Sequence, residues 1–242
     1  MDAIILAGGL GTRLRAAVPD VPKPMAPIAG RPFLAWLIEY WVAQGVQRLI
    51  LSVGYKHEAI RKYFGDAWGG CPVRYAIESQ PLGTGGGLLL ALTQLTPRAA
   101  TLVLNGDTFF DVSLAALRDA HGQHKAAITL ALTGNRVPGR FSGVELDASG
   151  RILNLAARSG TAAPIVNGGV YLLDPAALSG ETSGVRLSFE DDVLPRLIAS
   201  GARVQGLVAS GRFIDIGVPK DYRRCQDWFG KLPGARVVAA KY

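Results

Sequence analysis

The chain has 242 residues, 49% of them hydrophobic and 19% charged, a composition that excludes a disordered chain. Its apolar runs are far shorter than the roughly 20 residues that cross a bilayer, and no basic region precedes the first of them, so we expect neither a membrane span nor an export signal. The formal net charge of +7 comes from scattered lysines and arginines without a basic run. This pattern favours a small polyanion such as a nucleotide over a nucleic acid as the partner.

The two cysteines, Cys71 and Cys225, lie far apart and form no C-x-x-C motif. That spacing favours neither a disulfide framework nor a zinc site. We therefore expect the reducing environment of the cytoplasm.

Strands and helices alternate in the first half of the sequence. Short apolar runs predict strands at 3–7, 48–53, 73–77 and 101–107, while helical spacing predicts helices at 32–44, 57–64 and 84–95, the last capped by Thr84. This alternation predicts a mainly parallel sheet with helices on both faces, in which ligands bind beyond the carboxyl ends of the strands.

The second half has more strands and fewer helices. Strands are expected at 127–133, 141–147, 151–155, 166–173 and 203–208. A capping pattern at 188–191 opens a helix to about 199, and Pro219 begins a last helix over 219–229. We expect this half to be mixed and partly antiparallel, and no Pro/Ser-rich linker separates it from the first half.

The glycine-rich segment LAGGLGTRL at 6–14 directly follows the first predicted strand. Its backbone N–H groups can face a bound anion there, although it matches neither G-x-G-x-x-G nor the P-loop pattern. A simple glycine turn before a helix is the alternative, and Thr12 and Arg13 argue against it. Lys23 stands between Pro22 and Pro24, which restrict the backbone of a second cation suited to phosphate.

Two aspartates follow apolar segments. Asp107 ends the predicted strand at 101–107, and Asp215 lies between two isoleucines. Carboxylates at such positions need partners, and Mg²⁺ held by one or two carboxylates plus substrate phosphates would supply one. An Asx turn at Asp107 and a salt bridge from Asp215 to Arg212 are the alternatives. Asp111 is a weaker candidate.

These segments resemble the sugar-1-phosphate nucleotidyltransferases over nearly the whole chain. The shared motifs are LAGGLGTRL at 6–14, PKPM at 22–25, PLGTGG at 81–86, LNGD at 104–107, NGGVY at 167–171 and FIDIG at 213–217. Three longer stretches, at 15–28, 105–112 and 188–197, are most similar to the bacterial D-glycero-α-D-manno-heptose 1-phosphate guanylyltransferases.

The resemblance implies an α/β, single-domain, Rossmann-like nucleotidyltransferase fold over residues 1–242, with a nucleotide-binding half at about 1–125 and a sugar-phosphate-binding half at about 126–242. It also implies that a sugar 1-phosphate attacks the α-phosphorus of a nucleoside triphosphate, without a covalent enzyme intermediate. A catalytically silent nucleotide-sugar sensor is the alternative from another class, and the intact set of charged residues argues against it. Oligomeric state stays open, with a homo-oligomer possible.

The same resemblance assigns the site residues. The catalytic residues are Arg13, Lys23, Asp107 and Asp215, of which the two aspartates bind Mg²⁺. The nucleotide-binding residues are Leu6, Ala7, Gly8, Gly9, Gly11, Thr12, Arg13, Lys23, Glu78, Pro81, Gly83, Thr84 and Asp107. The sugar-phosphate-binding residues are Gly143, Arg158, Asn167, Gly168 and Gly169.

Two of these positions bear on specificity. Relatives usually show a Glu-Lys pair where this chain has Ala157-Arg158, so Arg158 is either the phosphate ligand or a surface residue. Glu78, five residues before Gly83, corresponds to the position that faces the base. A carboxylate there accepts the two adjacent donors of guanine, whereas Gln80 would suit the uracil or thymine of a uridylyl- or thymidylyltransferase if the loop were shifted.

Overall fold

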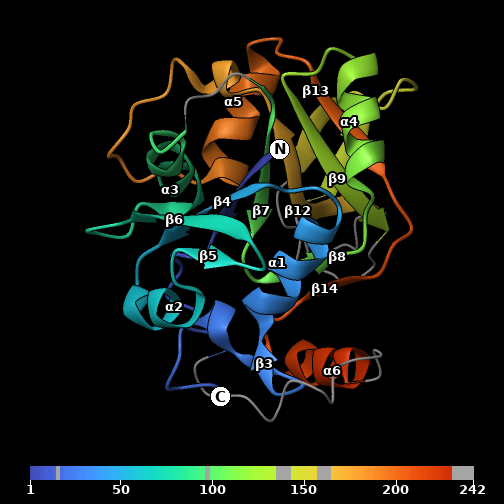
Figure 1. The fold of residues 1–242 in the computed structure, drawn as a ribbon. Coiled ribbons are helices and arrows are strands. Elements are labelled where there is room, and N and C mark those ends of the chain that lie inside the picture. The colour runs from blue at the N-terminus through green and yellow to red at the C-terminus, as the bar shows by residue number, and fades with distance from the viewer. Residues whose placement is uncertain (15–16, 96–98, 135–142, 157–164, 231–242) are drawn as a thin grey trace.

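The computed structural model describes residues 1–14, 17–95, 99–134, 143–156 and 165–230. Its centre is a ten-stranded mixed sheet in the order β11-β10-β12-β7-β1-β4-β6-β5, with β9 joined to β12 and β13 joined to β9 (Figure 1). These strands are β1 (Asp2–Leu6), β4 (Arg48–Val53), β5 (Ala67–Trp68), β6 (Cys71–Ile77), β7 (Thr101–Asn105), β9 (Ile128–Gly134), β10 (Gly143–Leu146), β11 (Ile152–Ala156), β12 (Ile165–Leu173) and β13 (Val204–Val208).

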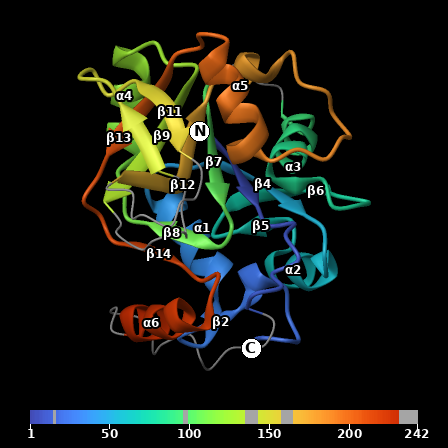
Figure 2. The same ribbon diagram turned by 180° about the vertical axis from the view of Figure 1, so that it is seen from behind.

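Helices cover both faces of the sheet (Figure 2). They are α1 (Phe33–Ala43), α2 (His57–Phe64), α3 (Gly83–Leu92), α4 (Leu114–Gln123), α5 (Leu194–Ala199) and α6 (Pro219–Phe229). Short helical turns lie at Lys23–Met25, Pro175–Leu178 and Phe189–Val193. Two small antiparallel sheets complete the fold, one of β2 (Pro27–Ile28) with β3 (Arg31–Pro32) and one of β8 (Thr108–Phe110) with β14 (Phe213–Asp215).

The predicted parallel sheet is confirmed in the first half. β1 pairs in parallel with β4 and β7, and β4 pairs in parallel with β6. Successive residues of β1 enter different cores, since Ala3 and Ile5 pack with α1 while Ile4 packs with α3 and α5. Burial on both faces explains why this strand is a continuous apolar run rather than an alternating one.

The second half joins the sheet through β12, which is antiparallel to β7, β9 and β10. This confirms the expectation of a mixed, partly antiparallel half. Along β12 the register shifts between Asn167 and Tyr171. A bulge of this kind re-aims the side chains around it, and here it lies beside the carboxyl end of β7.

The prediction that Thr84 caps the helix at 84–95 is wrong. Helix α3 begins at Gly83, whose φ is +73°, and no side chain caps it. The hydroxyl of Thr84 instead donates to Glu190 Oε2 at 2.6 Å and accepts from the backbone N–H of Phe189 at 2.8 Å. The Thr84 hydroxyl, which the sequence pattern assigned to the end of α3, therefore bonds to Phe189 and Glu190, more than a hundred positions along the chain.

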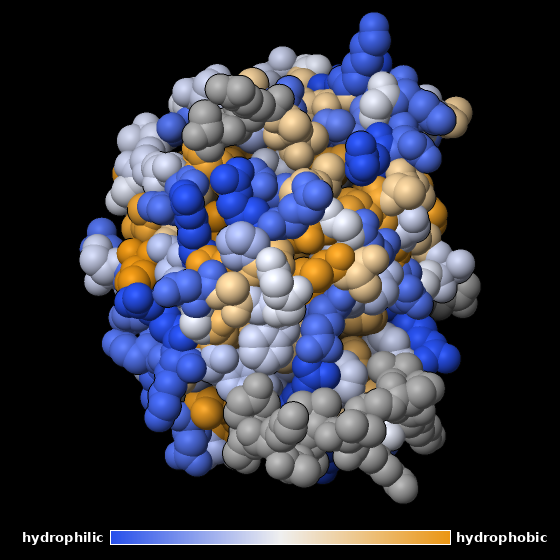
Figure 3. Space-filling view, in the orientation of Figure 1, coloured by the Kyte–Doolittle hydropathy of each residue, from blue (hydrophilic) through white to orange (hydrophobic). Residues whose placement is uncertain are grey.

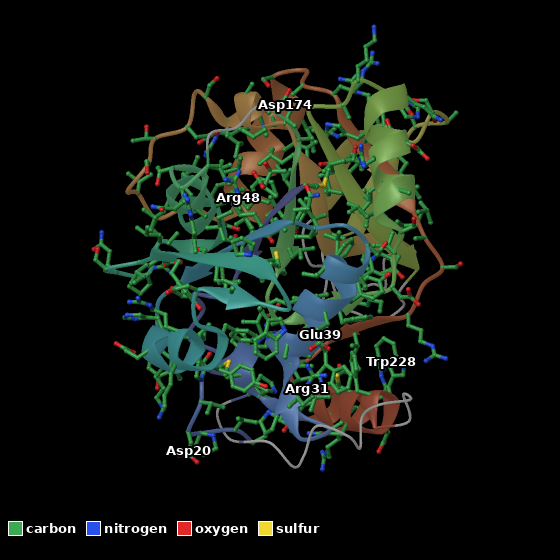
Figure 4. The ribbon with its side chains drawn as sticks, viewed as in Figure 1. Asp20, Arg31, Glu39, Arg48, Asp174 and Trp228 are labelled. Atoms are coloured by element: carbon green, nitrogen blue, oxygen red, sulfur yellow. The ribbon has the colours of Figure 1, made fainter. Side chains whose placement is uncertain are left out.

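The segment after Lys23 is anchored at several points. Within the β2–β3 hairpin, Pro27 O accepts from the Tyr222 hydroxyl of α6 at 2.7 Å, and Ala29 N donates to Gln226 Oε1 at 2.7 Å. Arg31 forms an ion pair with Glu39 of α1, and Figure 4 labels both side chains as well as Trp228 of α6. The backbone that carries Lys23 is thus fixed by both α1 and α6.

Within the described residues, no helix is long and apolar enough to cross a membrane. Polar and charged residues alternate with small apolar patches on the face shown in Figure 3.

Candidate active site

An open cavity of about 910 Å³ lies where β1, β4, β6 and β7 end. It brings together most of the residues predicted from the sequence. Those in its wall are Leu6, Ala7, Gly8, Gly9, Gly11, Thr12, Arg13, Lys23, Glu78, Pro81, Gly83, Thr84, Asp107, Asn167, Gly169 and Asp215. The position matches the expectation that ligands of an α/β sheet bind beyond the carboxyl ends of its strands.

The glycine loop that follows β1 needs its glycines for close approach. A Cβ on Gly8 would lie 2.3 Å from Glu78 Oε1, and a Cβ on Gly11, whose φ is +61°, would lie 2.8 Å from Lys23 Cβ. Side chains at these positions would displace the two charged residues. Thr12 and Arg13 are exposed on the same loop at the wall of the cavity.

Lys23, Asp107 and Asp215 form one cluster. Lys23 Nζ contacts Asp107 Oδ2 and lies 3.5 Å from Asp215 Oδ1, and the lysine side chain is only 9% exposed. Burial would raise the pKa of Asp107, but the charge and hydrogen bond of Lys23 hold it below its usual value. The cluster therefore places two carboxyl side chains beside one lysine.

The two aspartates meet because two short strands pair. Asp107 stands in the turn between β7 and β8, and Asp215 of β14 is directly opposite Thr108 of β8. The backbone N–H of Ile216 also donates to Asp107 O at 3.0 Å. This pairing brings together carboxylates that are more than a hundred positions apart in the chain.

Glu78 follows β6 and lies in the cavity wall against the glycine loop. Its Oε2 accepts from Leu82 N at 2.9 Å, and its Oε1 lies 3.4 Å from Ser52 Oγ. Burial raises the pKa of Glu78, and these two hydrogen bonds only partly oppose that rise. The carboxylate is positioned by the protein before any ligand binds.

Glu190 is a central residue that the sequence reasoning missed. Its Oε2 accepts from Thr84 Oγ1, while its Oε1 accepts from Asn105 Nδ2 at 3.3 Å and from the Tyr171 hydroxyl at 3.0 Å. These donors come from α3, β7 and β12. Glu190 therefore connects the first turn of α3 to the opposite wall of the cavity.

The opposite wall is built on the bulge of β12. Asn167 donates from Nδ2 to the Tyr171 hydroxyl at 2.8 Å and accepts at Oδ1 from Gly169 N at 3.0 Å. Gly169 has a φ of +70° and lines the cavity beside Asn167. Gly168 instead backs onto Phe110, because a Cβ there would lie 2.4 Å from that ring.

The two other predicted sugar-phosphate ligands are placed differently. Gly143 is buried in β10, opposite Ala156 and Val166, and lies outside the cavity wall as far as that wall is described. Arg158 and the preceding Ala157 lie outside the described residues. Arg186, Asp191 and Asp192, which the sequence reasoning did not single out, contribute charged groups to the same cavity.

The aspartate pair fits a magnesium ion that is shared with a substrate. The oxygens of Asp107 and Asp215 already converge on one cationic atom, Lys23 Nζ. Across the part of the chain that the structure describes, no three His, Cys, Asp or Glu residues form a metal cluster. Mg²⁺ commonly takes one or two carboxylates and completes its shell with phosphates and water, so two carboxylates suffice.

Several known proteins are similar to this chain over nearly its whole length. The profile of the family described as "Nucleotidyl transferase" matches residues 2–228.

The chain is 40% identical over 226 residues to the D-glycero-alpha-D-manno-heptose 1-phosphate guanylyltransferase of Aneurinibacillus thermoaerophilus, covering 93% of this chain and 97% of that protein. It is 39% identical over 222 residues to the Campylobacter jejuni protein of the same description, covering 92% and 97%. The crystal structure of HddC from Yersinia pseudotuberculosis complexed with GMP-PN is similar with a TM-score of 0.81, at 32% identity and over 94% of this chain and 99% of that chain.

Proposed function

This chain belongs to the nucleotidyl transferase family, and from that premise we propose that it transfers GMP from GTP to D-glycero-α-D-manno-heptose 1-phosphate. The observation that carries the proposal is a single cavity that holds Lys23, Asp107, Asp215 and Glu78 together. The description of the two bacterial relatives and the GMP-PN complex of HddC support the same base and sugar. Because the proposed reaction uses GTP, we also propose a cytoplasmic location.

The reaction needs positioning and charge neutralisation more than acid–base groups. A phosphate oxygen of the sugar 1-phosphate attacks the α-phosphorus of GTP, the bond to the β-phosphate oxygen breaks, and pyrophosphate leaves with that electron pair. The backbone N–H groups of the glycine loop, with Arg13 and Lys23, bind the triphosphate. These cations act most strongly in the transition state, when charge moves to the leaving pyrophosphate.

In this proposal, Asp107 and Asp215 hold Mg²⁺. The bound ion supplies charge neutralisation at the α-phosphate. Thr108 Oγ1 donates to Asp107 Oδ1 at 3.2 Å, and Gly217 N donates to Asp215 Oδ1 at 2.5 Å. These two hydrogen bonds from the protein fix the orientation of both carboxylates.

The sugar phosphate occupies the other side of the cavity. Asn167 and Gly169 of the β12 bulge meet the sugar, while Gly143 of β10 and Gly168 of β12 lie in the strands that carry this wall, and Arg158 binds the sugar's phosphate in place of the usual lysine. The nucleotide half at about 1–125 and the sugar half at about 126–242 then meet in one site. Glu190 connects them through its bonds to Thr84 and Tyr171.

A panel of triphosphates against a panel of sugar 1-phosphates tests the proposal. Pyrophosphate release is measured for GTP, UTP and dTTP with heptose, mannose and glucose 1-phosphates, and product mass identifies the nucleotide sugar. We expect GTP with the heptose phosphate to give the highest kcat/KM. Preferential use of UTP or dTTP would assign a uridylyl- or thymidylyltransferase instead, and no pyrophosphate from any pair would leave a nucleotide-sugar sensor.

We expect Arg13→Ala to lower kcat by about 10- to 100-fold, because charge-assisted contacts to a leaving group are each worth about 1.5–3 kcal/mol. Steady-state kinetics with saturating sugar phosphate measures the effect. The matched control is Arg74→Ala, which removes an exposed arginine of β6 outside the cavity wall as described and leaves kcat unchanged. A rise in KM for GTP alone would make Arg13 a ground-state binding residue.

Glu190→Gln is expected to lower kcat/KM for the sugar phosphate by about 10- to 100-fold, with a change in GTP affinity of less than about threefold. The amide cannot accept from all three donors that now contact the carboxylate. The cavity wall formed by Asn167 and Tyr171 is then no longer held in place by Glu190. Separate titrations of each substrate measure the split. Glu181→Gln, which breaks an ion pair with Arg196 outside the cavity, is the control. Equal losses for both substrates would contradict a role of Glu190 that is specific to the sugar-phosphate side of the cavity.

A further inference from the structure

Lys23 occupies the point on which the two proposed metal ligands converge. Its Nζ contacts Asp107 Oδ2 and lies 3.5 Å from Asp215 Oδ1. Asp215 is also shielded, with its side chain 13% exposed. The lysine therefore neutralises part of the charge on the two carboxylates from within the protein.

The fold makes room for this placement. A Cβ on Gly217 would lie 3.0 Å from Lys23 Nζ, and one on Gly11 would lie 2.8 Å from Lys23 Cβ. Pro22 and Pro24 restrict the backbone on either side of the lysine. Two close approaches and a fixed backbone distinguish this lysine from a surface side chain that meets a carboxylate by chance.

A lysine ammonium group and a divalent ion compete for these oxygens. The ammonium group and the metal repel each other, and each needs Asp107 and Asp215 as partners. In the structure, Lys23 has these two carboxylates as its anionic partners. When a triphosphate enters, its phosphates offer Lys23 a second anion of higher charge, and the carboxylates become available to the metal.

We propose that Lys23 is the resident counter-ion of Asp107 and Asp215 in the nucleotide-free protein, and that it leaves them for the triphosphate when metal and nucleotide bind. The proposal rests on the metal role assigned above. It makes Lys23 a switch between two anionic partners as well as a triphosphate ligand. As a consequence, the nucleotide-free protein binds metal weakly, and the carboxylates stay paired until substrate arrives.

Direct metal binding tests the proposal without turnover. Mn²⁺, as a probe for Mg²⁺, is titrated into the nucleotide-free full chain by calorimetry and by water-proton relaxation. We expect Lys23→Met to lower the Kd for Mn²⁺ by at least about tenfold relative to the unmodified protein, because the competing charge is gone. Adding Asp107→Asn to Lys23→Met abolishes that tight site and so identifies it.

The matched control is Arg13→Met, which removes one positive charge from the same cavity but leaves the Lys23 contacts in place. Its Kd for Mn²⁺ changes by less than about threefold, since an exposed charge acts only through screened, longer-range attraction. Lys23→Gln is the second variant in case Lys23→Met does not fold. The melting temperature of each folded variant with and without Mn²⁺ gives an independent readout of binding.

Equal Mn²⁺ affinity in the unmodified protein and in both Lys23 variants would overturn the proposal, as would an equal gain in Arg13→Met. A gain that survives Asp107→Asn would overturn it and also the metal assignment. Failure of the proposed function looks different. The protein would then not release pyrophosphate from GTP with the heptose phosphate, while the dependence of Mn²⁺ affinity on Lys23 and Asp107 would still hold.

Discussion

We expect Asp107→Asn and Asp215→Asn each to lower kcat by at least about a thousandfold in saturating Mg²⁺, because each removes a charged ligand from the ion that we propose neutralises the reacting phosphate. An amide keeps the shape of the carboxylate, so the loss reflects charge rather than packing. Pyrophosphate release under single-turnover conditions measures the chemical step. Circular dichroism and thermal melting verify the fold.

The control for these variants is Asp111→Asn. Asp111 is exposed, accepts from the Tyr40 hydroxyl at 2.9 Å and lies outside the cavity wall as described. We expect it to keep kcat within about twofold of the unmodified value, as surface substitutions usually do. Near-normal turnover in either Asp107→Asn or Asp215→Asn would remove that residue from the metal site.

The sheet was predictable where both of its faces are buried. The strands β1, β4 and β7 appear in the sequence as continuous apolar runs because helices cover them on both sides. The short strands of the second half predicted only that this half is mixed and partly antiparallel. Which of these strands pair with one another depends on contacts between residues far apart in the chain. The periodicity of apolar residues within one strand carries no information about such contacts.

The meeting of the two aspartates was not predictable from local pattern. β8 and β14 have three residues each, too few for any period to show, and their pairing alone places Asp215 opposite Thr108. In the sequence, only the resemblance to a known family pairs Asp107 with Asp215. The structure adds Lys23 between them, which no spacing in the sequence indicates.

Glu190 shows how a correct local interpretation can hide a site residue. The capping pattern at 188–191 is confirmed, since Ser188 Oγ accepts from Asp191 N at 3.0 Å. Glu190 stands within that pattern, and its role depends on Thr84 and Tyr171, which arrive from α3 and β12. Thr84 was misassigned as a helix cap for the same reason: its partner lies over a hundred positions away.

Glu78 is the residue that we propose selects guanine. Guanine presents N1–H and the exocyclic N2–H₂ side by side, and an ionised carboxylate can accept both. The protein uses only part of the acceptor capacity of Glu78, through Leu82 N at 2.9 Å and Ser52 Oγ at 3.4 Å. Gly8 and Gly87 lack the side chains that would crowd Glu78 Oε1. The Glu78 carboxylate is therefore held in a fixed position in the cavity wall and can still accept hydrogen bonds from a base.

We expect Glu78→Gln to lower kcat/KM for GTP by about 10- to 100-fold and to raise the relative use of UTP or dTTP, because the amide replaces one acceptor by a donor. Competition assays with paired triphosphates measure the ratio directly. Gln80→Ala is the control, since Gln80 is exposed and lies outside the cavity wall as described. If Gln80→Ala shifts the ratio and Glu78→Gln does not, the loop reads the base through Gln80.

The pH profile gives the same prediction a second readout. Burial raises the pKa of Glu78, so protonation removes an acceptor from the base site at a higher pH than for an ordinary glutamate. We expect kcat/KM for GTP to fall as the pH is lowered toward that raised pKa. Glu78→Gln lacks the titrating group, so its profile loses this acidic limb and keeps only the limbs due to the phosphates and the metal ligands. An identical acidic limb in both proteins would mean that Glu78 does not contact the base.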